Sequence, residues 1–405
     1  MPDAKNIALL QHLKPRNFLS FGPDNAGIDL QPLNLFIGPN GSGKSNLIEA
    51  ISLMRSAPKE FREVTRKGGG VAEWIWKGKQ KAPASVEWVV SYPNELKPIR
   101  HEGECKPIRH AVAFHPVSQA FSLDDERVED TEVRYKDEDD VYFYYRYQRG
   151  QPVVNTVREG QRRLAKDTIE PDRSILAQRR DPEAYPELAW LAQSYEKIRI
   201  YREWSVGRSA VFREPQKADV RNDTLEEDFS NLGLFLNRLK TRFPAAKKAI
   251  LAGLKDLYEG ITDFDVLIEG GTVQVFFTEG DFSIPATRLS DGTLRYLCLL
   301  AILCDPTPPP LICIEEPELG LHPDILPKVA ELLIKASERT QLIVTTHSDI
   351  LVDAMTETPE CVVVCEKHDG KTEMNRLSAA KLKTWLEKYR LGQLWIEGQL
   401  GGKRW

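Results

Sequence analysis

The sequence lacks the bulk features of a secreted, membrane-spanning or broadly DNA-coating protein. Its 405 residues carry a net charge of −5, which argues against a generally basic nucleic-acid surface and leaves only local patches open. The longest apolar run, LCLLAILC at 297–304, is much too short to span a bilayer. The opening MPDAKNIALLQHLK has no charged-then-apolar signal layout. We therefore expect a cytoplasmic protein that makes no use of a membrane.

Cysteine offers no metal or redox pattern either. The sequence contains no CxxC pair, and three of the six cysteines lie inside apolar runs, where a thiol behaves as a small hydrophobic group. Reduced core residues are therefore a better interpretation than a metal or redox centre. The sequence also shows no internal repeat and no sustained heptad pattern. The six are Cys105, Cys298, Cys304, Cys313, Cys361 and Cys365.

What is present is an alternation of strands and helices at both ends of the chain. Segments 1–60 and 285–377 predict a mainly parallel core sheet covered on both faces. Residues 61–160 hold short alternating runs such as SVEWVVSY, which predict an antiparallel β lobe. Residues 161–284 predict a helical insert followed by a hairpin, and 378–405 a C-terminal helical tail. We interpret the acidic stretch from Asp124 to Asp140 as a solvated loop of the lobe.

The stretch GPNGSGKS at 38–45 satisfies GxxxxGK[ST] between an apolar strand and a helix. Its glycines let the backbone wrap an anion with several N–H groups, and the helix start adds partial positive charge. Lys44 would reach the outer phosphates, and Ser45 would ligate Mg²⁺. The nucleotide-binding residues predicted here are Gly38, Asn40, Gly41, Ser42, Gly43, Lys44 and Ser45.

The stretch PPLICIEEPELGLHP at 309–323 ends an apolar strand in two adjacent carboxylates. Successive strand side chains alternate, so Glu315 and Glu316 should point in different directions. One could hold the Mg²⁺ shell while the other orients and polarises an attacking water. Two solvated acids at a strand end would be the commoner interpretation of this pair alone, but the phosphate loop reverses that preference.

The stretch LIVTTHSDIL at 342–351 is another apolar strand that ends in polar residues. His347 lies where it could contact a terminal phosphate, and Thr346 and Ser348 suit helix caps. A lone histidine at a strand end is more often structural. Its position in the chain after the carboxylate pair favours the functional interpretation.

The stretch LSDGTLRYL at 289–297 has the properties of a second phosphate-binding helix start. Ser290 can hydrogen-bond to a phosphate, and Gly292 permits close backbone approach. Asp291 would repel a phosphate if it pointed inward, so we expect it to cap the helix or to face a cation such as Arg288 or Arg295. Because the phosphate loop already serves its own subunit, this helix start is predicted to serve the ATP of another subunit.

In this order the motifs resemble the ABC-type ATPases, and more narrowly the RecF/SMC group with its OLD-type and stand-alone relatives. NGSGKSN is a form of phosphate loop common in that group and adds Asn46 to the predicted nucleotide-binding residues. LSDGT looks like a variant of the ABC signature LSGGQ. The resemblance implies an α/β fold of the ABC-type P-loop NTPase head, with ATP and Mg²⁺ as its ligands. It maps the catalytic carboxylate onto Glu316, the metal-shell acid onto Glu315 and the switch histidine onto His347, beside Lys44.

Other family elements match less completely. ELGLHP at 318–323 corresponds to the loop that crosses the dimer interface. Gln178 precedes the helical region as the metal-binding glutamine of the family should, although a surface glutamine is nearly as good an interpretation. No long coiled coil separates the two halves, so SMC-type arms are not expected. Only about 40 residues follow VVVCEKHDG in this sequence, so we do not expect a Toprim nuclease domain there either.

Two functions of different classes follow. The first is an ATPase that closes as a head-to-tail homodimer with composite ATP sites and regulates a partner protein or a DNA transaction, as in bacterial defence. The second is a nucleotide-dependent scaffold that holds a separately encoded effector, such as a nuclease or toxin, with slow turnover. A transporter ATPase shares the motifs, but the lobe and insert between phosphate loop and LSDGT argue against it.

DNA contact stays open at this point. Basic clusters at 157–166 and 237–248 could meet phosphates on the outer face of a closed dimer. Solvated arginine and lysine side chains on loops and helices are the commoner interpretation of such clusters.

Overall fold

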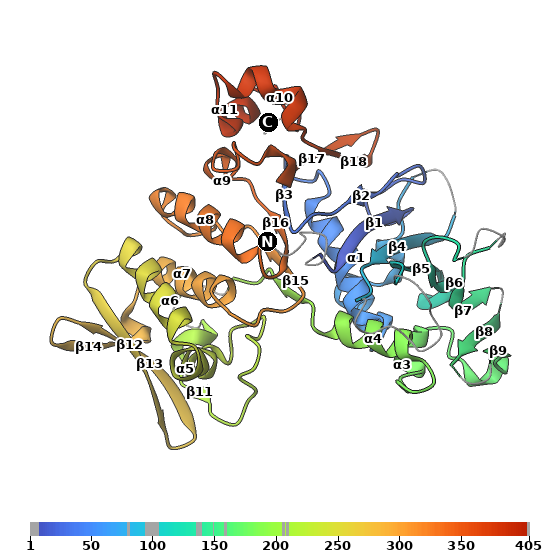
Figure 1. Ribbon diagram of the computed structural model, residues 1–405, viewed down its shortest axis with the longest axis horizontal. Helices are drawn as coiled ribbons and strands as arrows, with labels where there is room; N and C mark the ends of the chain where they lie inside the picture. The colour runs from blue at the N-terminus through green and yellow to red at the C-terminus, as the bar shows by residue number, and fades with distance from the viewer. Residues whose placement is uncertain are drawn as a thin grey trace.

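The structure is a computed structural model whose strands form three sheets (Figure 1). It describes residues 8–78, 82–93, 105–134, 140–148, 150–157, 160–204, 207 and 210–402, apart from the side chains of residues 166 and 212. Within these residues no helix is both long and apolar enough to cross a bilayer.

A six-stranded sheet lies at the centre in the order β10-β15-β16-β3-β17-β18. All neighbours in it are parallel except β17 and β18. Every residue of β3 and β16 is buried, as expected for strands covered on both faces. The strands are β3 (Leu33–Ile37), β10 (Arg199–Tyr201), β15 (Leu311–Glu315), β16 (Gln341–Thr345), β17 (Val362–His368) and β18 (Lys371–Arg376).

This sheet separates two hydrophobic cores. Phe36 of β3 packs into one core with α1 and α4, whereas its neighbours Leu35 and Ile37 pack into the other with α5 to α9 and α11. That alternation along a single strand is the reason both faces are apolar. The helices are α1 (Lys44–Ser56), α2 (Phe61–Lys67), α3 (Ile175–Gln178), α4 (Pro186–Glu196), α5 (Leu232–Arg242), α6 (Pro244–Leu257), α7 (Asp291–Leu303), α8 (Leu326–Ala336), α9 (Asp349–Asp353), α10 (Ala379–Leu386) and α11 (Leu391–Ile396).

An eight-stranded antiparallel sheet forms the lobe, in the order β2-β1-β4-β5-β6-β7-β8-β9. Its first two strands come from the N-terminal segment that the sequence assigned to the core, because β1 pairs along its length with β4. The strands are β1 (Leu10–Arg16), β2 (Ile28–Asp29), β4 (Ala84–Val90), β5 (Ile108–Val117), β6 (Ala120–Asp130), β7 (Phe143–Gln148), β8 (Gln151–Thr156) and β9 (Gly160–Arg163).

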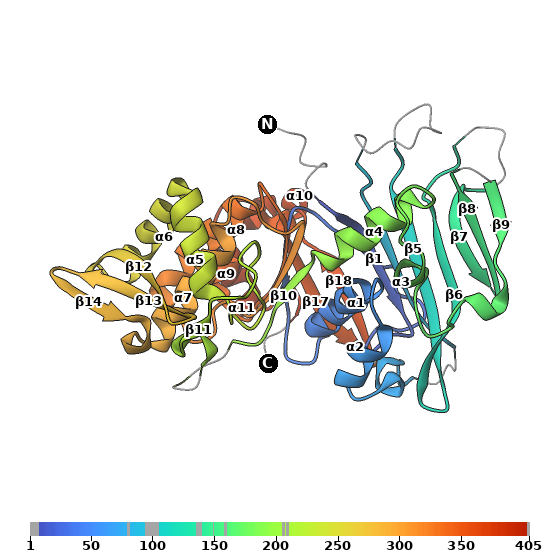
Figure 2. The same ribbon diagram turned by 90° about the horizontal axis from the view of Figure 1, so that it is seen from below.

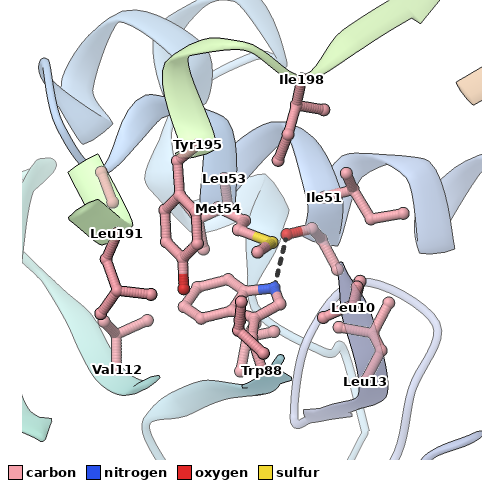
Figure 3. Close-up of a cluster of buried hydrophobic side chains, with 14 of the residues drawn as sticks. Leu10, Leu13, Ile51, Leu53, Met54, Trp88, Val112, Leu191, Tyr195 and Ile198 are labelled. Carbon is pink, nitrogen blue, oxygen red and sulfur yellow. Dashed lines mark hydrogen bonds between the residues drawn. The ribbon is translucent and has the colours of Figure 1, made fainter. Parts of the chain in front are cut away.

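The lobe packs directly on the helix that follows the phosphate loop. In Figure 3, side chains of β1, β4 and β5 meet those of α1 and α4, and the Trp88 indole donates to the carbonyl oxygen of Ala50 at 3.2 Å. Leu10, Trp88, Ile51 and Tyr195 in this cluster are almost fully buried. The lobe therefore fixes the position of α1 relative to the core sheet.

The acidic stretch of the lobe is not a solvated loop over its first half. Residues up to Asp130 belong to β6, and Glu126, Glu129 and Asp130 are buried. Glu129 and Asp130 form ion pairs with Arg146 and Arg134, and Glu126 accepts hydrogen bonds from the Ser174 hydroxyl and the Ile175 N–H. Residues 135–139 lie outside the described part of the chain.

The segment predicted as a helical insert contributes to all parts of the molecule. α3 and α4 accompany the lobe, β10 joins the core sheet beside β15, and α5 and α6 pack against a small third sheet (Figure 2). That sheet contains the predicted hairpin strands β12 (Ile261–Glu269) and β13 (Thr272–Glu279) with β11 (Gln216–Lys217) and β14 (Phe282–Pro285).

Candidate functional site

The phosphate loop connects β3 to α1 and depends on three left-handed glycines. Gly38, Gly41 and Gly43 have φ of 144°, 76° and 102°, which L side chains rarely adopt. A Cβ on Gly43 would lie 2.2 Å from the Thr372 hydroxyl, and one on Gly38 would lie 2.2 Å from the carbonyl oxygen of Cys365. At Gly41 the same atom would meet nothing within 4 Å, so this turn stands open. The loop is thus packed tightly at both of its ends and open in the middle.

Side chains from distant segments brace this loop from behind. The Thr372 hydroxyl of β18 lies 2.8 Å from the carbonyl oxygen of Ser42 and 2.7 Å from the Ser20 hydroxyl. Asn46 donates its side-chain amide to the same Ser20 oxygen at 2.7 Å. The sequence placed Asn46 among the nucleotide-binding residues, but its amide is engaged in holding the loop. Asn40 and Gly41 are exposed at the open turn.

Lys44 is buried at the start of α1 and is held by the loop itself. Its ammonium donates to the carbonyl oxygens of Gly38 at 2.8 Å and Pro39 at 3.1 Å. Burial lowers its pKa, and the nearby carboxylates of Glu316 and Glu318 oppose that shift. Hydrogen bonds to neutral carbonyls can be exchanged for bonds to phosphate oxygens, which are stronger acceptors for an ammonium.

Glu315 ends β15 close to Ser45 and Arg202. Burial raises the pKa of its carboxyl, and the Arg202 guanidinium and the Ser45 hydroxyl oppose that rise. The Arg202 Nε lies 3.6 Å from Glu315 Oε2, and its Nη1 lies 2.5 Å from Glu49 Oε1. Burial disfavours the charged guanidinium, but these two carboxylates outweigh it and raise the pKa of Arg202.

The residues here fit a magnesium ion that takes most of its ligands from phosphate and water. Oε1 of Glu315 is buried without a hydrogen-bond partner among the described residues. Within that part of the chain no group of three or more His, Cys, Asp or Glu side chains could hold a metal. Mg²⁺ is commonly bound by one or two carboxylates plus substrate phosphates. Ser45 and Glu315 would supply the protein ligands.

Glu316 diverges from Glu315 and meets His347. Its φ is 47°, unusual for a non-glycine residue, while its backbone N–H still donates to Thr345 at 2.9 Å. Glu316 Oε1 lies 3.4 Å from His347 Nε2. Because β15 and β16 are parallel neighbours, their carboxyl ends share one sheet edge, where these two side chains meet.

A third carboxylate, Glu318, was missed as a site residue at the sequence level. Its Oε1 accepts from the Thr346 hydroxyl and from the His347 N–H, both at 2.7 Å. Burial raises its pKa. Glu318 thereby fixes the loop that carries His347 against the loop that follows Glu316. Ser348 caps α9 as predicted, since its hydroxyl accepts from Leu351 N–H at 3.2 Å.

Gln178, predicted as a metal ligand, is not brought to this edge. Its amide oxygen accepts from Glu170 N–H at 2.9 Å, and its NH₂ donates to Arg173 O at 2.8 Å, so it closes its own turn. Two residues later Arg180 bonds to the carbonyl of Pro58, beyond the C-terminal end of α1. A helix of 13 residues is about 20 Å long, so Gln178 lies at the wrong end of α1 for Ser45.

The segment after β10 comes close to the predicted metal ligands instead. Arg202 faces Glu315, and the Trp204 indole donates to the backbone carbonyl of Glu315 at 2.7 Å. The only sequence signal was the short alternating run KIRIYREW at 197–204. It forms a three-residue strand, which is too short for a pattern of alternation to identify.

The LSDGT segment forms the start of α7 and lies apart from α1 along the long axis of the molecule (Figures 1 and 2). Ser290 is exposed and caps the helix, accepting from Thr293 N–H at 3.1 Å. Asp291 faces a cation, as the sequence predicts, but the cation is Arg213 rather than Arg288 or Arg295. Asp291 accepts from Arg213 at 2.5 Å and from Gly207 N–H at 3.1 Å. The Arg213 bond lowers the pKa of Asp291.

The fold of this chain resembles that of solved SMC head domains. An SMC head bound to the C-winged helix domain of ScpA aligns with 92% of this chain and 99% of its own, at 15% identity and a TM-score of 0.59. An SMC head with an extended coiled coil, derived from Pyrococcus furiosus and bound to the C-terminal domain of ScpA, covers 94% and 99%, at 14% identity and 0.56. At these identities the likeness shows the fold. No curated protein sequence matches significantly.

The family match covers most of the chain. The family described as "AAA domain, putative AbiEii toxin, Type IV TA system" matches residues 33–353. This span begins in β3 and includes the phosphate loop, both glutamates at the end of β15, the LSDGT segment and His347. The chain therefore belongs to this AAA family, and its fold resembles that of the solved SMC heads.

Proposed function

We propose that the protein hydrolyses ATP with Mg²⁺ and closes as a head-to-tail homodimer around two ATP molecules. The observation that carries this proposal is a divided site. Lys44, Glu316 and His347 gather at one edge of the core sheet, while Ser290 is exposed at the start of a separate element, α7, with Gly292 half-buried beside it. A second subunit turned head to tail would bring its Ser290 and Gly292 to the open side of the phosphate loop.

Each residue has a defined task in this proposal. Lys44 exchanges its bonds to loop carbonyls for the outer phosphates, and Ser45 and Glu315 hold the cation. Bound there, Mg²⁺ would supply positive charge that neutralises the phosphates. Glu316 accepts a hydrogen bond from the attacking water, and His347, 3.4 Å away, orients that carboxylate and contacts the terminal phosphate.

Closure of the proposed dimer would provide a movement that acts on a partner molecule. The family description and an SMC head bound to a winged-helix domain both support a role that involves a partner protein. We infer that the dimer regulates a separately encoded partner, and that this takes place in bacterial defence. In the alternative function the same dimer stores an effector, such as a toxin or nuclease, and slow hydrolysis releases it. Partner-triggered turnover would favour storage, and DNA-stimulated turnover would favour a motor.

The surface charges give less support to a contact with DNA than to a protein partner. In the cluster at 237–248, Lys247 pairs with Asp263 at 2.7 Å and Lys240 pairs with Asp265. These ion pairs weaken the positive potential that a DNA phosphate would meet. The cluster at 157–166 lies partly outside the described residues. DNA therefore remains a secondary proposal beside a protein partner.

The test of the proposal is Glu316→Gln. This substitution keeps the shape of the side chain and removes the acceptor strength that attack requires, so hydrolysis should stop while ATP stays bound. Light scattering with ATP and Mg²⁺ should then show a stable dimer that wild type forms only transiently. Glu373→Gln, at an exposed position of β18, is the matched control and should hydrolyse ATP normally. If Glu316→Gln stays monomeric at every ATP concentration, composite sites are excluded.

A further inference from the structure

Arg295 is an arginine of the LSDGTLRYL stretch that the proposed chemistry leaves unused. It lies in the second turn of α7 and is only 8% exposed. Its guanidinium makes no ion pair with Asp291, which is bound by Arg213 instead. Its hydrogen-bonding partners are main-chain carbonyls, an uncommon use of a buried charge.

These two carbonyls belong to different loops. Nη1 of Arg295 donates to the carbonyl oxygen of Leu319, in the loop after Glu316. Nη2 donates at 3.2 Å to the carbonyl oxygen of Trp204, in the loop after β10. The planar fork of a guanidinium can bridge two such acceptors at once, whereas the ammonium of lysine acts as a point charge.

Both loops pack closely around this side chain. A Cβ on Gly320 would lie 2.8 Å from Arg295 Nη1, and the φ of 72° at this position is one that L side chains rarely adopt. A Cβ on Gly292 would lie 3.1 Å from the carbonyl oxygen of Gly320. The first turn of α7 and the loop after Glu316 are therefore in direct contact, with Arg295 behind them.

The Trp204 loop extends this connection to the metal-binding strand. The Trp204 indole donates to the backbone carbonyl of Glu315 at 2.7 Å, and its ring stacks on Phe229 with centroids 5.6 Å apart. Further along the loop, Gly207 N–H donates to Asp291. The end of β15 and the start of α7 are thus joined through two independent bonds to one loop.

We propose that Arg295 is a positioning residue that locks the loops after Glu316 and after β10 onto the start of α7. The metal-binding end of one subunit and the Ser290–Gly292 end that it offers to its partner then move as one unit. Binding of Mg²⁺ and ATP in one site thereby sets the orientation of the helix that completes the other site. This inference rests on the proposed head-to-tail dimer and adds the residue that couples its two sites.

The test compares Arg295→Met and Arg295→Lys in the Glu316→Gln background. Methionine keeps the length and apolar stem, and lysine keeps the charge but cannot bridge both carbonyls. In both variants the dimer should dissociate at least about tenfold more readily with ATP and Mg²⁺, the change expected from losing one hydrogen bond to a charged group. ATP affinity of the monomer, measured at low protein concentration, should stay within about twofold of the parent, because Arg295 does not face its own phosphate loop.

Controls separate positioning from general damage. Arg242→Met removes an exposed positive charge of α5 and should leave dimerisation unchanged. Hydrogen exchange of the monomer should be faster in the Arg295 variants at 289–295 and at 316–321, and unchanged in the lobe. Should methionine prevent folding, the lysine variant alone decides between bridging and charge.

The outcomes are distinct for the two proposals. If the Glu316→Gln parent fails to dimerise, the proposed function falls, and faster monomer exchange at both segments still supports the lock. If the parent dimerises and the Arg295 variants dimerise with the same affinity, the lock is overturned while the proposed function stands. Equal losses of monomer ATP affinity and dimer affinity would also overturn it, because they indicate a merely structural arginine.

Discussion

Replacing Thr372 by valine should loosen the phosphate loop without altering any residue proposed to touch nucleotide. Thr372 lies in β18, more than 300 residues from the loop in sequence, and its hydroxyl is hydrogen-bonded to Ser42 O and to Ser20. Valine has nearly the same shape and keeps the backbone bond from residue 372 N–H to Ser20 O. The substitution therefore removes only the side-chain hydrogen bonds.

The magnitude follows from burial. Thr372 is 2% exposed and Ser42 is 1% exposed, so water cannot replace the lost partner at the Ser42 carbonyl. Leaving a buried acceptor unsatisfied costs about 1–3 kcal/mol. The Ser20 hydroxyl is affected less, because it still accepts from Asn46. If this cost destabilises the loop conformation that binds ATP, ATP affinity should drop by roughly tenfold for each 1.4 kcal/mol.

Two measurements check this prediction. The urea midpoint gives the change in stability, and titration calorimetry gives the ATP dissociation constant of the monomer. Thr372→Ser is the matched control, because it keeps the hydroxyl and removes only a methyl group, worth about 0.8 kcal/mol. It should bind ATP like wild type. Valine and serine variants with equal ATP affinity would refute the view that this hydroxyl holds the loop in its binding conformation.

Two further predictions concern the carboxylates at the edge of the sheet. Glu318→Leu should lower kcat by about tenfold or more and leave ATP affinity unchanged, because it leaves buried polar groups of Thr346 and His347 unpaired. Glu318→Gln, whose side-chain oxygen can still accept both hydrogen bonds, should show a smaller decrease in kcat. Equal decreases in kcat for the two variants in steady-state assays would contradict this prediction. The raised pKa of Glu315 means that its carboxyl takes up a proton at a higher pH than an exposed glutamate, and the protonated form cannot ligate Mg²⁺. The Mg²⁺ concentration for half-maximal turnover should therefore rise as pH is lowered toward that pKa, and a flat profile would contradict the assignment of Glu315 as ligand.

The parts of the site that the sequence predicted share one physical basis. Lys44, Glu316 and His347 each follow a buried apolar strand, and parallel neighbours bring their carboxyl ends to one edge. Strand identity and direction were therefore enough to place these side chains together. The pairing of β1 with β4 was missed because antiparallel pairing with a segment some 70 residues away leaves no local signal.

The parts that were missed depend on long-range polar contacts. Gln178 was chosen from its position in the chain, but only the folded turn shows that its amide is already used by Glu170 and Arg173. Arg213, the partner of Asp291, lies 78 residues away from it. No periodicity links two such residues, and several nearby arginines would satisfy the same charge argument. Electrostatic reasoning predicted that Asp291 needs a cation, and only the fold selects which one.

The stretch from β10 to α7 is where prediction failed most and where the site is most closely interconnected. Trp204 reaches Glu315 across 111 residues, Arg295 reaches Trp204 across 91, and Gly207 reaches Asp291 across 84. All three are hydrogen bonds between residues far apart in the chain, and Arg295 also bonds to the carbonyl oxygen of Leu319. Strands that carry the phosphate loop and the carboxylates are instead held by continuous ladders and two apolar cores. Contacts of this range tie α7 to the end of β15, in agreement with the proposed locking role of Arg295. They leave no periodicity in the local sequence from which to predict them.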